Sequence, residues 1–241
     1  MQLTDFKALT FDCYGTLIDW ETGIYDALKP LLAKVDDEVN RDTALELFAR
    51  LETAQEAATP SMLYPNLLAA VHADMSRHWH VESDEELDRQ FGDSVQNWPA
   101  FSDSASALTY FKQHYQLFIL SNIHREGFAA SNEKLGVEFD GIYTAEDIGS
   151  YKPDPRNFEY LLTHLETRGI GKGDILHTAQ SLHHDHVQAT ALGLATNWID
   201  RRHGSEGYGA TVPPKADVRI DFHFPSMAAF VEAHKEVAGN I

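Results

Sequence analysis

Residues 9–19 read Leu-Thr-Phe-Asp-Cys-Tyr-Gly-Thr-Leu-Ile-Asp, and this stretch decides the fold. An apolar run ends at one carboxylate, Asp12, and the turn-forming pair Gly15-Thr16 follows at once. The pattern predicts a buried strand that turns sharply after Asp12. A polar side chain at the carboxyl end of such a strand faces the crevice in which open α/β sheets bind their ligands. Asp12 is therefore the first candidate functional residue.

The two residues after Asp12 limit the chemistry that this loop can perform. A magnesium-dependent phosphatase would place a second carboxylate at position 14, to help hold the ion and to protonate the leaving oxygen, whereas this chain has Tyr14. Tyrosine does neither job well at neutral pH. Cys13 is the only cysteine, which excludes an internal disulfide and a cysteine-cluster metal site. Because neighbouring strand residues point to opposite faces, we expect Cys13 to pack in the core rather than act as a nucleophile.

Size and composition describe a globular protein with a small-molecule substrate. A chain of 241 residues with 43% apolar content suits a core domain with a smaller insertion. The net charge of −18 disfavours nucleic acid and anionic membranes as partners. No apolar stretch reaches the roughly 18–20 residues of a membrane span, and residues 1–5 lack signal-peptide features, so we expect a cytoplasmic location.

Hydrophobic periodicity divides the chain into two parts. Helical spacing of apolar residues occupies 21–35, 41–58, 62–79 and 84–93, and strand-like runs are nearly absent there. From about residue 97 onward strands alternate with helices, with strands expected at 116–121, 141–144, 174–178 and 195–199 and helices at 156–168 and after Pro225. Such alternation predicts a doubly wound, Rossmann-like parallel sheet covered on both faces. We therefore assign residues 1–17 and 97–241 to an α/β core domain and residues 18–96 to an all-helical cap domain.

Four predicted strands end in polar residues, and in a doubly wound sheet these ends converge on one crevice. They are Asp12, Ser121-Asn122, Lys152 and Asp185. A carboxylate can attack carbon or phosphorus and form an intermediate that water then cleaves. Lys152 would hold Asp12 ionised, and Asp185 would position Lys152 or activate the water. Each residue alone could instead form a turn, cap a helix or lie in solvent; their order along the chain favours catalysis.

These residues resemble the four motifs of the haloacid dehalogenase superfamily, over the whole chain. The matching segments are Asp12-x-Tyr14-Gly15-Thr16-Leu17, Leu120-Ser121-Asn122, Tyr151-Lys152-Pro153-Asp154-Pro155 and Asp185. The Asp-x-Tyr-Gly-Thr form is similar to the type II, L-2-haloacid dehalogenase branch. The resemblance implies Asp12 as nucleophile, with support from Thr16, Ser121, Asn122, Lys152 and Asp185. It also implies no metal and no cofactor, a small carboxylic acid as substrate, and a homodimer.

The chain departs from the pattern of this branch around the leaving group. The fourth motif usually runs Ser-Ser-Asn, and this chain has Gln180-Ser181-Leu182, so one polar group of the water-handling network is apolar here. Ser181 remains a substrate-binding candidate. The family's cap arginine, which holds the halide, has Arg50 as its nearest counterpart, with Arg41 and Arg77 as alternatives.

Aromatic and histidine side chains supply the remaining candidates. Tyr14 and Trp20 are further substrate-binding candidates, and Trp20, at the entry to the cap, is placed to roof the crevice. Tyr64 is a cap residue for which packing is the favoured interpretation. The histidines of His183-His184-x-His186 lack a second cluster, so we interpret them as loop residues, with His184 near the site.

The leaving group stays open at this point. The best family match is a 2-haloacid dehalogenase, which requires hydrogen-bond donors around a departing halide. The alternative is hydrolytic ring opening of L-azetidine-2-carboxylate by the same mechanism, where the leaving group is the protonated ring nitrogen. Carboxylates and aromatic rings would suit its charge. A phosphatase and a non-catalytic binding protein are less favoured.

Overall fold

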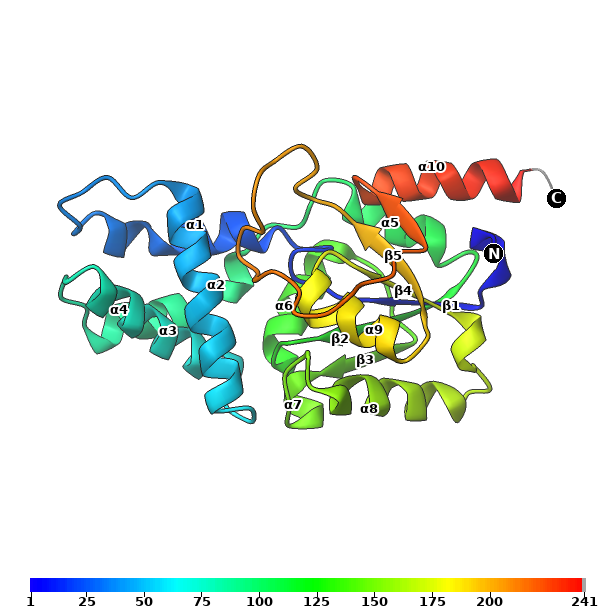
Figure 1. Cartoon of the computed structure of the whole chain (residues 1–241), viewed down its shortest axis with the longest axis horizontal. Coiled ribbons are helices and arrows are strands. Elements are labelled where there is room, and N and C mark those ends of the chain that lie inside the picture. The colour runs from blue at the N-terminus through cyan, green and yellow to red at the C-terminus, as the bar shows by residue number, and fades with distance from the viewer. Residues whose placement is uncertain (240–241) are drawn as a thin grey trace.

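Within residues 1–239, which the computed structural model describes, a six-stranded parallel sheet forms the centre of the molecule (Figure 1). Its strand order is β3-β2-β1-β4-β5-β6, and every pair of neighbours is parallel. The bounds are β1 Ala8–Phe11, β2 Gln116–Ser121, β3 Gly141–Thr144, β4 Ile175–Ala179, β5 Ala195–Ile199 and β6 Phe222–Phe224. The chain adds β2 and β3 on one side of β1 and β4, β5 and β6 on the other. The direction in which strands are added therefore reverses at β1, and the topological switch point, where such sheets bind ligands, lies at the carboxyl end of that strand.

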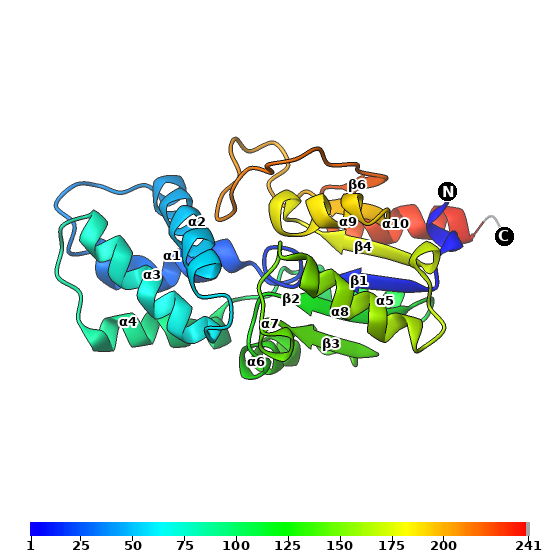
Figure 2. The ribbon, with the colours of Figure 1, turned by 60° about the horizontal axis from the view of Figure 1, so that its bottom comes forward.

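Helices cover both faces of the sheet. On one face lie α8 Pro155–Glu166 and α9 Val187–Ala191, and on the other lie α5 Ser104–Phe111, α6 Arg125–Leu135 and α10 Met227–Ala238 (Figure 2). Side chains of β2 alternate between the two layers, because successive strand residues point to opposite faces. Phe118 and Leu120 pack with α8, whereas Leu117 and Ile119 join the larger cluster on the opposite face. The predicted doubly wound α/β core is confirmed.

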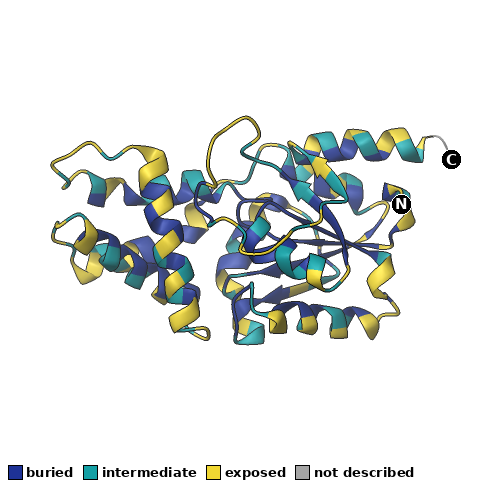
Figure 3. Ribbon diagram, viewed as in Figure 1, coloured by how far each residue is buried: buried dark blue, intermediate teal, exposed yellow. Residues whose placement is uncertain are grey.

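Four helices form a separate group beside the sheet (Figures 1 and 2). They are α1 Trp20–Leu32, α2 Arg41–Ala58, α3 Tyr64–His78 and α4 Glu85–Gly92. All four fall inside the predicted cap range, although the exact division at residues 18–96 stays a prediction. Figure 3 shows buried residues lining the inner sides of these helices and exposed residues on their outer sides. No helix within residues 1–239 is long and apolar enough to cross a membrane.

Two adjacent chain segments join the cap to the core. The backbone N–H of Asp19 donates to the carbonyl of Pro99 at 2.8 Å, and that of Phe101 donates to Leu17 at 3.1 Å. The second segment carries Trp98, which packs against Gly23 of α1; a Cβ on that glycine would lie 2.2 Å from the Trp98 ring. Only glycine therefore allows α1 to approach the returning chain this closely.

The predicted elements agree with the observed ones to within a few residues. The strands at 116–121, 141–144 and 195–199 match their predicted bounds, and α2 matches its predicted range. The last helix, α10, begins after the N-cap Ser226, whose hydroxyl accepts from the N–H of Ala229 at 3.0 Å. No range was predicted for α5, α6 or β6. A short connection, α7 Ala145–Ile148, follows β3.

Candidate active site

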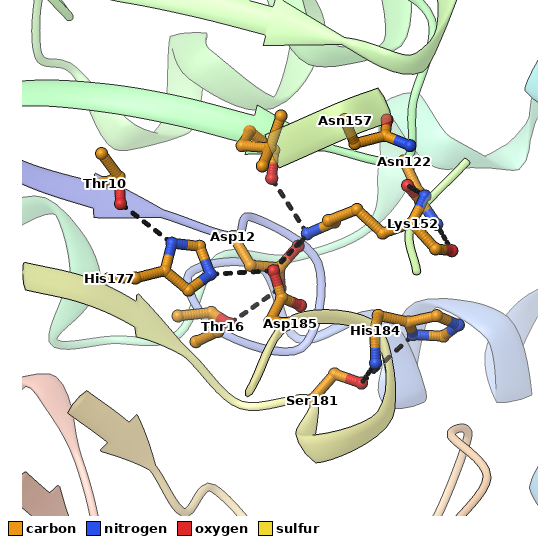
Figure 4. A network of polar contacts seen from close by, with 12 residues as sticks. Thr10, Asp12, Thr16, Asn122, Lys152, Asn157, His177, Ser181, His184 and Asp185 are labelled. Atoms are coloured by element: carbon orange, nitrogen blue, oxygen red, sulfur yellow. Dashed lines mark hydrogen bonds and ion pairs between the residues drawn. The ribbon is translucent and has the colours of Figure 1, made fainter. Parts of the chain in front are cut away.

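Asp12 lies immediately after β1, buried at the switch point of the sheet (Figure 4). Its backbone N–H donates to the carbonyl of Thr178 in β4 at 3.1 Å, which ties the loop to the sheet. The hydroxyl of Thr16 donates to Oδ2 of Asp12 at 2.8 Å and accepts from the N–H of Gln180 at 2.9 Å. The turn after β1 thus fixes one carboxylate oxygen of Asp12.

Lys152 holds the other oxygen of Asp12. Its ammonium lies 2.9 Å from Oδ1 of Asp12 and 2.6 Å from Oδ1 of Asp185, and it donates to the Leu120 carbonyl at 3.0 Å. The side chain of Asn122 holds the backbone of Lys152. The side-chain oxygen of Asn122 accepts from the N–H of Lys152 at 2.6 Å, and the side-chain amide donates to the carbonyl of Lys152 at 2.9 Å. Each of the three N–H bonds of the Lys152 ammonium thus has an acceptor: Oδ1 of Asp12, Oδ1 of Asp185 or the Leu120 carbonyl.

The charges in this cluster stabilise one another. Burial raises the pKa of the Asp12 carboxyl, Lys152 opposes that rise, and Asp185 adds to it. Burial lowers the pKa of Lys152, but the two carboxylates outweigh it, so the pKa lies above its ordinary value. Burial also disfavours the charged form of Asp185, but Lys152 and His177 outweigh it, so the pKa of Asp185 lies well below its ordinary range. The net shift of the Asp12 pKa is upward, and Lys152 is the group that favours its ionised form against burial.

Asp185 is supported by residues of the sheet itself. His177 of β4 donates from Nε2 to Oδ1 of Asp185 at 3.0 Å, and its Nδ1 lies 2.9 Å from the hydroxyl of Thr10 in β1. Asp185 belongs to a π-helical turn over Leu182–His186, capped by the Ser181 hydroxyl, which accepts from the N–H of His184 at 3.1 Å. Such wide turns are frequent at functional sites.

Cap residues cover the carboxylate of Asp12 and close a small cavity. The cavity has a volume of about 30 Å³, and its walls include Trp20 of α1, Glu52 and Glu56 of α2 and Tyr64 of α3. Oε1 of Glu56 accepts from the amide of Asn122 at 2.9 Å, which links the cap to the core. Oε2 of the same glutamate lies 3.6 Å from Nε2 of His184. Acidic groups of the cap thus face Asp12 across the cavity.

The acidic cap groups have shifted protonation. Burial and the neighbouring Glu56 raise the pKa of Glu52 to about 8. Burial lowers the pKa of His184, but the Glu56 carboxylate outweighs it and the net shift is upward, which favours the imidazolium. At neutral pH the cap therefore presents a protonated Glu52 beside a Glu56–His184 pair. An additional cation next to Glu52 would favour loss of its proton.

Three buried polar atoms around the cavity make no hydrogen bond to the described residues. They are Oγ of Ser121, Nε2 of His184 and Oδ2 of Asp185. An unsatisfied buried polar atom is costly in a folded protein, so such atoms mark places where a substrate or a water molecule binds. A cavity of about 30 Å³ holds one or two waters, so a larger substrate requires the cap to open.

The structure brings together most of the residues expected at the site. Those that line the cavity are Asp12, Tyr14, Trp20, Ser121, Asn122, Lys152, Ser181 and Asp185, and Thr16 supports Asp12 from below. The ring of Tyr14 faces the cavity, but its hydroxyl lies 2.8 Å from Oγ of Ser131 and 3.2 Å from the Gly127 carbonyl in α6. Tyr64 and His184 also belong to the walls.

Arg50 is not brought to the site. It is exposed on α2 and does not line the cavity, because its position points away from the side that carries Phe48, Glu52 and Glu56. Arg77 is also exposed and pairs with Asp74 of its own helix, while Arg41 donates to the Thr22 hydroxyl at 3.1 Å. Of the described residues that line the cavity, the basic ones are Lys152 and His184.

Sequence reasoning missed the two glutamates of the cap. Their signal was present in α2, where Leu45, Phe48, Glu52 and Glu56 follow one another at the three- and four-residue spacing of a single helix side. Two acids on an otherwise apolar stripe are unusual, because ionised carboxylates are rarely buried without a partner. His177 was also missed, since nothing local distinguishes it from an ordinary strand residue.

Comparisons with known proteins agree with this geometry. A family model described as haloacid dehalogenase-like hydrolase matches residues 6–177. An (S)-2-haloacid dehalogenase 4A of Burkholderia cepacia is 25% identical over 66% of this chain and 69% of its own length, and an (S)-2-haloacid dehalogenase of Pseudomonas putida is 22% identical over 84% and 88%. The solved L-2-haloacid dehalogenase of Xanthobacter autotrophicus, with chloropropionic acid covalently bound, superposes with a TM-score of 0.75 at 16% identity, over 98% of this chain and 100% of that one.

Proposed function

The chain belongs to the haloacid dehalogenase-like hydrolase family, and on that premise we propose that it is a member of the 2-haloacid dehalogenase branch in which Asp12 attacks an sp3 carbon of a small 2-substituted carboxylic acid. One observation carries the proposal: Lys152 holds one oxygen of Asp12 and Thr16 the other, inside a closed cavity. A carboxylate fixed in this way is a positioned nucleophile rather than a structural ion pair. The covalently bound chloropropionic acid in the Xanthobacter relative supports the same assignment.

The reaction has two steps. In the first, an oxygen of Asp12 forms a bond to the substrate carbon, and the leaving group departs with the electron pair of the broken bond. In the second, water attacks the carbonyl carbon of the Asp12 ester, the alcohol product leaves with an oxygen that came from Asp12, and one proton is released. The free Oδ2 of Asp185 is placed to orient that water.

The cavity favours a cationic leaving group. Asp12, Glu52, Glu56 and Asp185 face Lys152 and His184 across about 30 Å³. A departing halide needs several hydrogen-bond donors, whereas Glu56 offers carboxylate oxygens and no arginine lines this cavity in residues 1–239. The ammonium of a strained cyclic amino acid, such as L-azetidine-2-carboxylate, would lie between these glutamates and the ring of Trp20. The Ser121 hydroxyl and the His184 imidazole are the donors suited to its carboxylate.

The bonds and protons of the ring-opening reaction are accounted for without a metal ion. Asp12 attacks the ring methylene attached to nitrogen, and the carbon–nitrogen bond breaks with relief of ring strain. The secondary ammonium becomes a primary amine, which then takes up one proton, and hydrolysis yields 2-amino-4-hydroxybutyrate. Glu52 lines the same cavity and can exchange that proton, since its pKa of about 8 lies near neutral pH.

Dehalogenation of a 2-haloacid is the second candidate, and the names of the relatives favour it. The two candidates share the attack by Asp12 and differ in the leaving group. Incubation of the metal-free protein with L-azetidine-2-carboxylate, 2-chloropropionate and fluoroacetate separates them, with 2-amino-4-hydroxybutyrate and halide as the readouts. We expect the amino acid product; halide release alone would assign the second candidate.

Two controls test the mechanism itself. Single turnover in heavy-oxygen water should leave the product unlabelled and place the label in Asp12. Label in the product instead would contradict covalent catalysis. Phosphate release from a generic ester on addition of magnesium would replace both candidates with a phosphatase.

A further inference from the structure

Three side chains with metal-binding chemistry converge beyond the end of β5. They are Asp200, His203 and His223, and one ligand atom from each lies within 4.8 Å of the others. None of the three lines the catalytic cavity. Two imidazoles and one carboxylate form a donor set that suits Zn²⁺ and neighbouring transition metals, and suits Mg²⁺ poorly, since Mg²⁺ prefers oxygen.

The backbone places these side chains together. Asp200 directly follows β5, and its N–H donates to the carbonyl of Phe224 at 2.8 Å, next to His223 in β6. The N–H of His203 donates to the carbonyl of Asp200 at 3.1 Å and closes a tight turn. The ring of His223 stacks on Trp198 of β5, with centroids 4.5 Å apart and planes 19° from parallel. A strand, a turn and an aromatic stack thus hold the ligands before any ion binds.

Two of the three spacings between the ligand atoms match a tetrahedral metal. Zinc bonds of about 2.0–2.1 Å at tetrahedral angles put two ligand atoms about 3.3–3.4 Å apart. Oδ2 of Asp200 lies 3.2 Å from Nδ1 of His203 and 3.3 Å from Nε2 of His223. The two imidazole nitrogens lie within 4.8 Å of each other, and a bound metal would require the exposed His203 side chain to move closer to His223.

We propose that Asp200, His203 and His223 form a binding site for a zinc-like divalent transition metal, separate from catalysis. The ion replaces the two imidazole–carboxylate contacts with three metal–ligand bonds, and solvent completes its coordination because both histidines are exposed. The net charge of −18 raises the local concentration of cations at the surface. The proposal does not depend on the proposed function.

A metal at this position would fix the segment that clamps the cap. Arg202, in the same turn, lies 2.8 Å from Oε2 of Glu21 in α1 and 3.2 Å from Oδ1 of Asp42 in α2. Its neighbour Arg201 donates to the Thr16 carbonyl at 3.0 Å and 2.9 Å, behind the catalytic loop. Metal binding therefore adds stability to a turn on which both contacts depend.

The test is metal binding to tag-free, chelator-treated full-length protein. Zn²⁺ is titrated by calorimetry, and Co²⁺ serves as a spectroscopic probe of its ligands. The variants are His223→Gln, His203→Gln and Asp200→Asn, which change partly or fully exposed side chains and leave the core intact. The matched control is His78→Gln, an exposed histidine of α3 in the cap.

We expect one Zn²⁺ per chain, a Co²⁺ spectrum of low coordination number, and at least tenfold weaker binding in each of the three variants. The His78→Gln control should bind as the unmodified protein does, and Mg²⁺ should not compete. Binding that survives in the His223→Gln variant would overturn the proposal. So would failure of the unmodified protein to bind Zn²⁺, which would leave Asp200 as a simple hydrogen-bond acceptor for two imidazoles.

Discussion

The hydroxyl of Tyr64 donates a 2.5 Å hydrogen bond to Oε1 of Glu52, and both side chains are buried where α3 meets α2. A hydrogen bond from a neutral donor favours the carboxylate, but burial and Glu56 dominate, and the pKa of Glu52 rises to about 8. The bond therefore orients a carboxyl group that is mostly protonated at neutral pH, in the wall of the cavity that Asp12 also lines.

The pKa of Glu52 predicts how stability depends on pH. Between the ordinary value of 4.5 and about 8, an unfolded chain has lost this proton and the folded chain keeps it, so unfolding free energy falls as pH rises. Replacement of Glu52 by Gln removes the contribution of Glu52 to the pH dependence of the unfolding free energy. We expect the difference in unfolding free energy between the variant and the unmodified protein to grow with pH, by up to about 1.4 kcal/mol per pH unit.

Urea denaturation at pH values from 5 to 8 measures this slope. Glu46→Gln, an exposed glutamate of the same helix, is the matched control. A difference that stays constant with pH would mean that Glu52 is ionised in the folded protein.

Asp12→Asn removes the nucleophile while it preserves shape. We expect turnover to fall by about 10⁴-fold or more, because the amide cannot form the ester, with only a small change in the affinity for substrate. Single-turnover measurements of product formation are the assay. Retained turnover would show that water attacks the substrate directly and that Asp12 only orients it.

Lys152→Met tests the ammonium that contacts both Asp12 and Asp185. Its removal leaves two buried carboxylates with like charge, so we expect a loss of about 3–5 kcal/mol of unfolding free energy. The pKa of Asp12 should rise further, because the cation that opposes its protonation is gone. The pH at which activity falls to half on acidification should then be higher in the variant. If that pH is unchanged, protonation of Asp12 is not what causes the loss of activity in acid.

Tyr14→Phe should leave catalysis nearly intact. The phenol oxygen is 2.8 Å from Oγ of Ser131, and thus serves the packing of the loop against α6. We expect kcat within about threefold of the unmodified value and a loss of about 1 kcal/mol in stability. A collapse of kcat with unchanged stability would show that the hydroxyl takes part in the reaction.

Arg201→Ala should destabilise the core next to the site. Its guanidinium pairs with Asp103 at 2.9 Å, donates twice to the Thr16 carbonyl and lies 4.0 Å above the Phe101 ring. Because the Thr16 carbonyl loses both donors and the half-buried Asp103 keeps only the N–H of Ala228, we expect a loss of about 1–3 kcal/mol in unfolding free energy. Arg77→Ala, on the exposed side of α3, should change stability by less than about 1 kcal/mol in the same urea titration.

The positions of the core strands could be predicted because local signals agree with the fold. The apolar run before Asp12 and the run at 116–121 read as strands that are buried on both faces, and both form at those places. By contrast, β6 has three residues and gains its partner only from the sheet edge, so nothing in its own sequence predicts it. The helix α5 is eight residues long and depends on packing against α10.

The core side of the site was predictable, whereas on the cap side Trp20 and Tyr64 were candidates and the two glutamates were not. Asp12, Lys152 and Asp185 each follow a strand, and parallel strands bring their carboxyl ends together whatever the details of packing. The approach of Glu52 and Glu56 depends on how α2 lies over the sheet, which no local pattern specifies. Arg50, two residues earlier in the same helix, shows the consequence: the residue type suited a halide site, but the rotation of α2 turns it to solvent.

Periodicity and the position of polar residues after strands were enough to predict the parallel sheet, the helical insertion, and Asp12 with Lys152 as the centre of the candidate site. What lies opposite Asp12 depends on long-range packing. Two buried glutamates and a histidine contact the cavity because helices from separate parts of the chain pack over the end of β1. Their chemistry depends on that proximity: burial and mutual repulsion raise the pKa of Glu52, and neither effect exists in the unfolded chain.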